Sequence, residues 1–156
     1  SMDISTGAAG GIYLGGTAAA NKLYDYEEGS WTPVISDSES GGNFGTAAGI
    51  RGAYTKIGNI VTLMFRFSNI NTTGMTAGND FFIQGVPFVS LNNNMQNPGS
   101  SFYTSMSGVI GSIAPSIAPN TTVIQSVEAD SQRVIVSDLD SGSADYFGTI
   151  VYHTAT

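Results

Sequence analysis

Two pairs of acidic residues near the C-terminal end of the chain have a spacing that suits catalysis. Asp138 and Asp140 are two residues apart, as are Glu128 and Asp130, so each pair would lie on one face of a strand. Glycoside cleavage uses two carboxyl groups roughly 5 to 9 Å apart, a distance that such pairs can meet. Both pairs also adjoin Ser- and Gly-containing segments, where Asp commonly caps a turn through its own side chain. We interpret the four carboxylates as turn residues, with catalysis as the alternative.

The segment Asp138-Leu139-Asp140-Ser141-Gly142-Ser143 also has partial calcium-loop character, because oxygen-bearing side chains recur at alternate positions. It lacks the later Glu that completes an EF-hand loop. Asp138 and Asp140 are therefore weak calcium candidates, and the sequence predicts no bound cofactor.

Other catalytic chemistries are poorly represented in the sequence. His153 is the sole histidine and there is no cysteine, which argues against a Ser-His-Asp triad, a thiolate nucleophile and a zinc site. The chain also lacks a G-x-S-x-G elbow and a phosphate-binding loop motif. We therefore predict that the chain is not an enzyme.

The charge balance argues against two classes of partner. The chain has 156 residues, of which only 11% are charged, and its net charge is -7. A chain of this charge repels phosphate backbones and gains little from counterion release, so we expect no nucleic-acid partner. No apolar run approaches the roughly 20 residues needed to span a bilayer, so we expect no membrane insertion.

Short β-strands must position the candidate residues, because period-two alternation recurs from Trp31 onward between clusters of Gly, Asn, Pro and Ser. In residues 60–68 every second residue is large and apolar, which is typical of a half-buried strand. The predicted strands are 32–36, 50–57, 60–68, 80–86, 102–113, 121–127, 132–137 and 145–153. Prolines and β-branched residues interrupt every helical candidate. The pattern predicts an all-β fold, an antiparallel β-sandwich of jelly-roll-like character.

Several of these strands carry apolar residues on both sides. Ile60 and Met64, for example, share a face with Thr62 and Arg66, opposite the apolar face of residues 60–68. Either a second layer of the same chain or a neighbouring subunit would cover such a face, and the pattern alone leaves both alternatives open.

Residues 1–30 differ in composition from the rest of the chain. They are rich in Gly, Ala, Ser and Thr and have no sustained periodicity. We interpret them as a connector or stalk that precedes a β-sandwich domain over residues 31–156, with a disordered linker as the alternative. Ser1-Met2 is typical of a cloning remnant, so we expect the chain to be a fragment from the end of a longer protein.

Three short motifs follow one another in the first part of the chain. Residues 26–33 read YEEGSWTP, residues 52–62 read GAYTKIGNIVT, and residues 83–88 read IQGVPF. They resemble the YEEGTWTP, GxYTKIGNxVT and IxGLPF motifs of C-terminal domains in bacteriophage tail-fibre and tailspike proteins, with Ser30 in place of the usual Thr. The resemblance covers about residues 10–90, and the remaining residues match only in their β character.

This resemblance implies a homotrimer at the tip of a virion appendage, made in the cytoplasm of the host bacterium and joined to upstream fibre or tailspike domains. It implies binding to a polysaccharide or another receptor on the bacterial surface. The alternative is a purely structural trimerisation domain, with recognition or enzymatic activity located upstream.

The motif residues also have physical explanations. Gly58-Asn59 is a hairpin or bulge signal between two β-rich runs. Trp31, next to Thr32-Pro33, is expected to anchor the core, with a glycan-stacking platform as the alternative. The residues assigned structural roles are Trp31, Tyr54, Gly58, Asn59, Pro87 and Phe88.

A run of amides is the place where we expect sugar contacts, in view of the resemblance. Amide side chains supply paired donors and acceptors for hydroxyl groups, and an aromatic ring supplies an apolar platform for a pyranose. A plain solvated loop is the alternative. The residues predicted to bind glycan are Asn92, Asn93, Asn94, Gln96, Phe102 and Tyr103.

Overall fold

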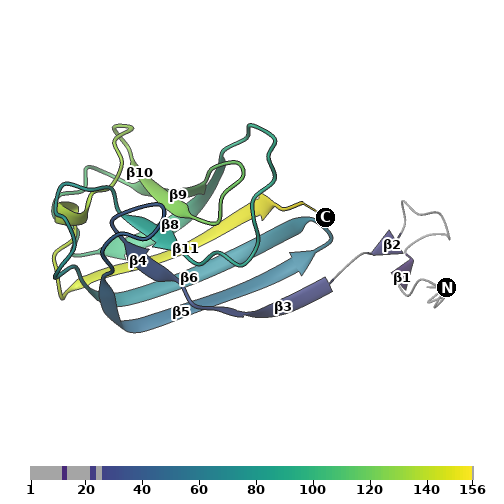
Figure 1. Ribbon diagram of the computed structural model, residues 1–156, viewed down its shortest axis with the longest axis horizontal. Coiled ribbons are helices and arrows are strands. Elements are labelled where there is room, and N and C mark those ends of the chain that lie inside the picture. Colours follow the sequence, from purple (N-terminus) through teal and green to yellow (C-terminus); the bar gives the residue numbers. More distant parts are fainter. Residues whose placement is uncertain (1–11, 14–21, 24–25, 156) are drawn as a thin grey trace.

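The computed structural model describes residues 12–13, 22–23 and 26–155 and is built of antiparallel β-strands (Figure 1). A two-stranded ladder pairs β1 (Ile12–Tyr13) with β2 (Lys22–Leu23). Most of the predicted connector over residues 1–30 lies outside the described residues. The other strands are β3 (Tyr26–Trp31), β4 (Val34–Ser36), β5 (Thr46–Ile57), β6 (Ile60–Asn71), β7 (Phe82–Gln84), β8 (Asn97–Thr104), β9 (Ile113–Ile117), β10 (Ile124–Glu128) and β11 (Ala144–His153).

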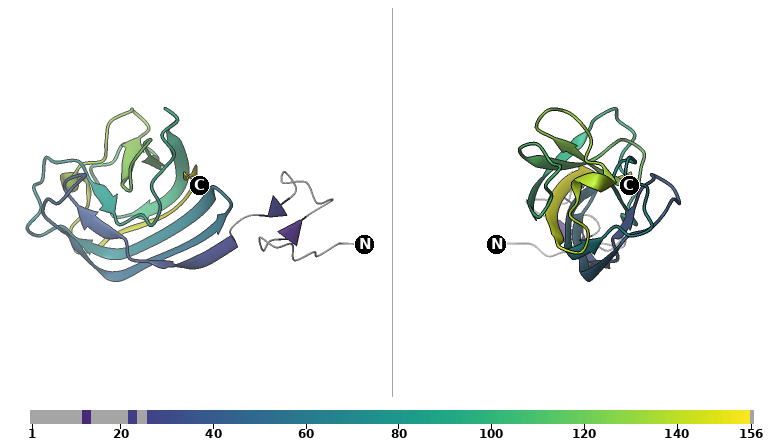
Figure 2. Two further views of the ribbon diagram at one scale, coloured as in Figure 1. Left: turned by 45° about the vertical axis from the view of Figure 1, so that its right-hand side comes forward. Right: turned by 90° about the vertical axis from the view of Figure 1, so that its left-hand side faces the viewer.

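These nine strands form one curled sheet in the order β3-β5-β6-β11-β8-β9-β10-β7-β4. The sheet turns back on itself at β8, whose Asn97 and Pro98 pair with β9 while Gly99 to Thr104 pair with β11. Figure 2 shows the two resulting layers. We call β3-β5-β6-β11-β8 the front sheet and β9-β10-β7-β4 the back sheet. The prediction of an all-β antiparallel sandwich is confirmed.

The hydrophobic core lies between the two sheets. The apolar residues predicted to share one face of residues 60–68 are all buried, as is Tyr146 of β11. The Tyr146 hydroxyl lies 2.7 Å from Ser126 Oγ of β10, so one hydrogen bond links the front and back sheets within the core. Burial raises the pKa of Tyr146 well above its usual value, because the ionised phenolate would lose its hydration.

Two predicted strands differ from the structure. Residues 102–113 are divided between β8 and β9, because Ser105 and Gly111 adopt positive φ angles that interrupt the extended backbone. Residues 132–137 form only isolated bridges at Arg133 and Ile135, followed by a 3₁₀ helix, η2 (Val136–Asp138). There Asp138 Oδ2 accepts a hydrogen bond from the Ile135 backbone N–H at 2.8 Å and caps the turn.

The front sheet also begins earlier than the alternation indicated. β3 includes residues 26–30, which the sequence analysis assigned to the connector, and it pairs with β5 along its whole length. β3 is an edge strand whose first five residues are exposed or half-buried. Its polar side chains therefore lack the alternation by which strands are recognised in a sequence.

The three motifs meet at one corner of the sandwich. Lys56 Nζ lies 3.4 Å from a Glu27 carboxylate oxygen, which joins the first motif to the second. Phe88 of the third motif packs edge-on against Tyr54, with ring centroids 5.1 Å apart. The Phe88 carbonyl also accepts a hydrogen bond from the Tyr152 hydroxyl at 3.0 Å. Residues of all three motifs therefore make contacts within the chain.

The turn between β5 and β6 is a two-residue hairpin loop. Ile57 pairs directly with Ile60, and of the two loop residues only Gly58 has a positive φ, of 59°. This pattern matches a type II′ turn, which places Gly at its first central position. The Asn59 carbonyl accepts a hydrogen bond from the Thr154 N–H at 2.8 Å, which fixes the C-terminal end of β11 to the turn. Pro87 is exposed next to Phe88.

Gly52 is required by the position of the Trp31 ring. A Cβ atom at Gly52 would lie 2.6 Å from Trp31 Nε1, whereas one at Gly49 in the same strand would lie 3.5 Å from its nearest neighbour, the Ser68 Cβ. We expect Gly52→Ala to lower the free energy of unfolding by about 1 to 3 kcal/mol through overpacking. Gly49→Ala is the matched control and is expected to be neutral or slightly stabilising. Urea unfolding of the two variants measures the difference, and equal stability would contradict the packing described.

Candidate binding faces

The residues predicted to bind glycan are divided among four places. Asn92, Asn93 and Asn94 are exposed in the loop before β8. Gln96 is exposed at the margin of the back sheet, where its Nε2 donates to Ser116 Oγ at 3.0 Å.

The two aromatic residues of the prediction lie further along β8. Phe102 is 64% exposed on the outer side of the front sheet. Tyr103 faces the core, and its hydroxyl donates to the Gly111 carbonyl. Phe102 lies six residues beyond Gln96, a separation of about 20 Å along an extended strand. The structure therefore does not bring the six residues into one cluster.

The candidate carboxylates near the C-terminus all accept hydrogen bonds within the chain. The Glu128 carboxylate accepts the Ile110 N–H at 2.7 Å, and the Asp130 carboxylate accepts the Gln132 N–H at 3.0 Å. The Asp140 carboxylate accepts the Ser107 hydroxyl. Asp130 and Asp138 thus contact their own turns, Asp138 as the cap of η2, whereas Glu128 and Asp140 contact the separate loop of residues 105–112. The described residues contain no group of three or more His, Cys, Asp or Glu side chains placed to hold a metal ion.

The outer side of the back sheet, which we call the back face, is polar. One row across it runs from Ser36 through Phe82 and Gln125 to Ser116, each residue paired with the next across the strands. The side chain of Gln125 is half-buried and forms no hydrogen bond within the described part of the chain. An amide that is partly removed from water without a partner is placed to bind a ligand hydroxyl.

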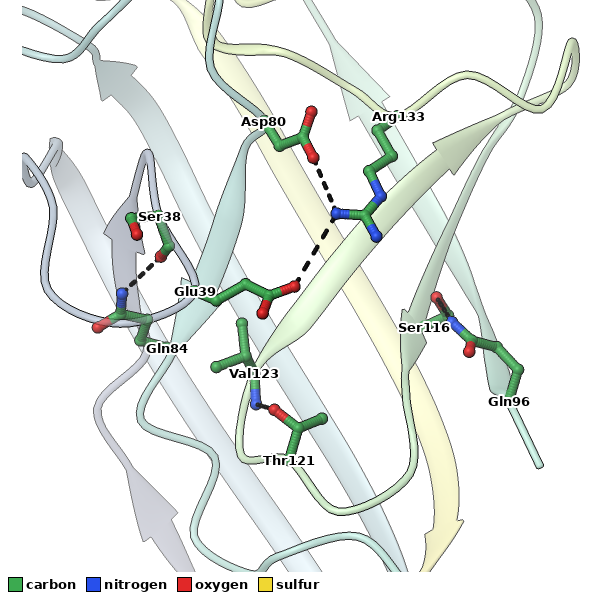
Figure 3. Close-up of polar contacts among 9 residues, drawn as sticks. All are labelled: Ser38, Glu39, Asp80, Gln84, Gln96, Ser116, Thr121, Val123 and Arg133. Atoms are coloured by element: carbon green, nitrogen blue, oxygen red, sulfur yellow. Dashed lines mark hydrogen bonds and ion pairs between the residues drawn. The ribbon is translucent and has the colours of Figure 1, made fainter. Parts of the chain in front are cut away.

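An ion-pair network crosses the same face (Figure 3). Arg133 Nη1 lies 2.8 Å from an Asp80 carboxylate oxygen and 3.9 Å from a Glu39 carboxylate oxygen. The guanidinium carbon also lies 5.9 Å from the centroid of the Phe82 ring and helps to cover it. Because both carboxylates approach one nitrogen, they lie within about 7 Å of each other, a separation that glycoside cleavage can use.

Two hollows flank Glu39 and Phe82 on the back face. The smaller, of about 240 Å³, is lined by Gln125 together with Glu39, Phe82 and the loop residues Asn120 and Thr121. The larger, of about 470 Å³, is lined by acidic and amide side chains that include Asp80. Polar hollows of this kind suit a ligand rich in hydroxyl groups.

Asp37 holds the loop that carries Glu39. Its carboxylate accepts hydrogen bonds from the Asn43 side-chain amide at 2.9 Å, from the Thr76 N–H at 2.8 Å and from the Asn43 N–H at 2.7 Å. These donors stabilise the ionised form and lower the pKa of Asp37 to about 2. Asp37 therefore joins the loop of residues 37–43 to the loop of residues 72–79.

The low pKa of Asp37 leads to a pH-dependent stability. Because the pKa is depressed in the folded chain from its usual 3.8, the stabilisation by Asp37 is complete above about pH 4 and is lost as the pH falls toward 2. Asp37→Asn should thus be less stable than the parent at pH 7, and the gap should narrow between pH 4 and 2. Urea midpoints measured at both ends test this, with Asp130→Asn as an exposed control. A gap that stays constant with pH would argue against the role.

The outer side of the front sheet, which we call the front face, is apolar at the end nearest the Gly58-Asn59 turn. Ile57, Ile60 and Val151 are exposed there, together with Tyr26 at the start of β3. Tyr26 pairs with Ile57 of β5, which pairs with Ile60 of β6. Val151 lies two residues from His153, the partner of Ile60 on β11. Exposed apolar side chains gathered on one sheet face are a feature that subunit contacts use. Met64 is also exposed further along β6, as the two-sided strand pattern indicated.

Sequence reasoning missed the back-face residues. Glu39, Asp80 and Arg133 come from three separate loops, and only the fold brings them together. Gln125 is half-buried in β10, a short strand whose apolar residues indicated that the strand belongs to the core. No spacing rule links these residues, although the strand alternation of residues 121–127 indicates that Gln125 faces away from Ile124.

The structure is an all-β module with a polar back face and a front face that is apolar at the end nearest the Gly58-Asn59 turn. The chain is similar to a depolymerase specific for the KN4 capsule from Klebsiella phage K64-1, with 32% identity over 107 residues. The similarity covers 68% of this chain and 14% of that depolymerase, so the chain spans a small part of the protein that it matches. No protein-family model and no solved structure matches the chain.

This similarity relates the chain to a bacteriophage protein, in agreement with the coarser part of the sequence-based prediction. It also points toward an enzyme rather than away from one, because the matched protein is a depolymerase. The expectation that the chain is not an enzyme therefore has a finding against it. Within the described residues, no helix is long and apolar enough to cross a membrane.

Proposed function

We propose that the chain is a module of a bacteriophage tail fibre or tailspike that binds a polysaccharide of the host surface through its back face. The observation that carries this proposal is the half-buried, unpartnered amide of Gln125 in a polar hollow. The similarity to a capsule-specific phage depolymerase supports the class of ligand. In this proposal the module is part of the virion and is joined to further domains of the same appendage.

The proposal includes assembly as a homotrimer. The apolar end of the front face, defined by Tyr26, Ile57, Ile60 and Val151, is the surface that supports it, because large apolar side chains there are exposed in the single chain. This end of the front sheet includes the first residue of β3, next to the predicted connector. A purely structural trimerisation module is the alternative, and binding measurements distinguish the two.

Binding at the back face is tested with Gln125→Ala. The chain is titrated with purified Klebsiella capsular polysaccharides, including the KN4 type, and the dissociation constant is measured by calorimetry. Loss of one or two amide hydrogen bonds, each about 0.5 to 1.5 kcal/mol, should weaken binding by roughly 2- to 100-fold. Gln132→Ala, an exposed Gln outside the hollow, is the matched control. Equal affinity of the parent and Gln125→Ala would remove the back face from the proposal.

Cleavage is a second candidate function, favoured by the Glu39–Asp80 separation and by the depolymerase similarity. It predicts that the chain releases reducing ends from its polysaccharide and that Glu39→Gln or Asp80→Asn abolishes the release. Asp138→Asn and Asp140→Asn serve as controls, because these two carboxylates already accept hydrogen bonds within the chain. Binding without release of reducing ends would favour the non-enzymatic proposal for this module.

A further inference from the structure

Two arginines face each other on the front sheet. Arg51 of β5 is directly opposite Arg66 of β6, and both are exposed on the front face. Like charges directly opposite each other destabilise a strand pair. The chain contains only five Lys and Arg residues, so placing two of them in such a pair points to a role outside folding.

Neither guanidinium has a carboxylate partner among the described residues. The ion pairs within 4.0 Å belong to Lys56 and Arg133. Arg66 Nε donates only to the Ser68 hydroxyl, at 3.2 Å. Asp145, on the neighbouring strand, directs its carboxylate to the Asn69 N–H at 2.8 Å. Most donors of the arginine pair are thus left to solvent.

Aromatic rings extend the arginine pair into a row. Arg66 pairs across the strands with Phe147, which pairs with Phe102. The Arg66 guanidinium carbon lies 5.4 Å from the centroid of the Phe147 ring, and the Phe147 and Phe102 centroids are 6.1 Å apart. Four neighbouring strands span about 14 Å. The row therefore places two cations beside an exposed apolar platform.

Surface hollows lie along this row. One, of about 490 Å³, is bordered by Arg51 and Arg66, and another, of about 360 Å³, by Phe102 and Phe147. Both are also lined by Met64, where they meet. The space is open enough to admit a chain molecule lying across the strands.

We propose that this row binds a saccharide that carries carboxylate groups, such as a polymer of uronic acids. Arginine is suited to this ligand because its planar guanidinium donates two parallel hydrogen bonds to a carboxylate. Phe102 and Phe147 offer an apolar surface to the sugar ring. With a net charge of -7, the rest of the chain repels such a polymer, so the charge complementarity is local to the arginine pair.

This site lies on the opposite sheet from the hollow at Gln125, and its test is separate from that of the proposed function. The probes are oligomers of galacturonic acid and of glucuronic acid, each beside its methyl ester, which keeps the ring and removes the charge. The parent chain should bind the acid forms at least about ten-fold more tightly than the esters. Arg51→Gln combined with Arg66→Gln should abolish this preference, whereas Arg133→Gln, on the back face, should retain it.

The outcomes that overturn the proposal are specific. Equal affinity for acids and esters, or no binding of either acid at millimolar concentration, would exclude the site. An acid preference that survives in the double variant would also exclude it, and Arg66→Gln alone serves if the double variant fails to fold. If the double substitution changes the molar mass of the assembly but not the acid preference, the arginines contact a second copy of the chain instead. Binding to neutral polysaccharide through Gln125 is unaffected by any of these results.

Discussion

Replacing Trp31 with Ala is expected to lower the free energy of unfolding by about 3 to 5 kcal/mol, the range for truncating a large buried aromatic residue. Trp31 is only 8% exposed and ends β3 at the point where the chain leaves the front sheet for β4 of the back sheet. Its indole N–H donates to the Met64 carbonyl at 3.1 Å, and its ring lies over Gly52. Both the volume and the hydrogen bond are lost in the variant.

A second substitution separates the contribution of the ring volume from that of the indole hydrogen bond. Trp31→Phe keeps most of the apolar volume and removes only the indole N–H, so we expect it to be destabilised by about 1 kcal/mol plus a modest packing penalty. Urea unfolding at one fixed protein concentration is the measurement, because assembly makes stability depend on concentration. A Trp31→Ala variant within about 1 kcal/mol of the parent would mean that Trp31 does not anchor the core.

The second large effect concerns assembly. If the apolar end of the front face is the subunit contact, Ile60→Asp combined with Val151→Asp must bury unpartnered carboxylates in it. Leaving a charge buried without a partner costs about 3 kcal/mol or more, which weakens association roughly 100-fold. Light scattering coupled to size exclusion should then give a mass near 16.2 kDa for the variant and about three times that value for the parent.

Two controls keep the assembly result interpretable. Ile60 and Val151 are exposed in the single chain, so the variant should keep its circular dichroism spectrum. Ala114→Asp places the same charge on the exposed back face and should leave the mass unchanged. A variant that remains trimeric would locate the subunit contact elsewhere, and a parent chain that is monomeric would count against the trimer itself.

The sequence predicted those parts of the fold that depend on strict alternation. β6 and β11 are long, buried on one side and bounded by turn residues, so the period-two pattern located them closely. β3 was not predicted, because the side chains of an exposed edge strand do not alternate between buried and exposed positions. The division of residues 102–113 into two strands was not predicted, because it depends on positive φ angles at Ser105 and Gly111. A serine in a sequence does not indicate a positive φ.

The site was harder to predict than the fold for a physical reason. The Asn92–Asn94 run and Phe102 are neighbours in sequence, but an extended strand separates residues by about 3.3 Å each. The back-face network instead joins residues from loops far apart in the chain, such as Asp80 and Arg133. The pairing of β10, β7 and β4 as neighbours in the back sheet brings them together. The turn role of Asp138 was easier, because its carboxylate caps backbone only three residues away.

The most direct test of the central claim is the affinity of the purified chain for host capsular polysaccharides, measured by calorimetry across the Klebsiella panel. We expect saturable binding to at least one polysaccharide, weakened in Gln125→Ala and unchanged in Gln132→Ala. A folded chain of the expected mass that binds none of them would contradict the claim and leave assembly as the function of the module.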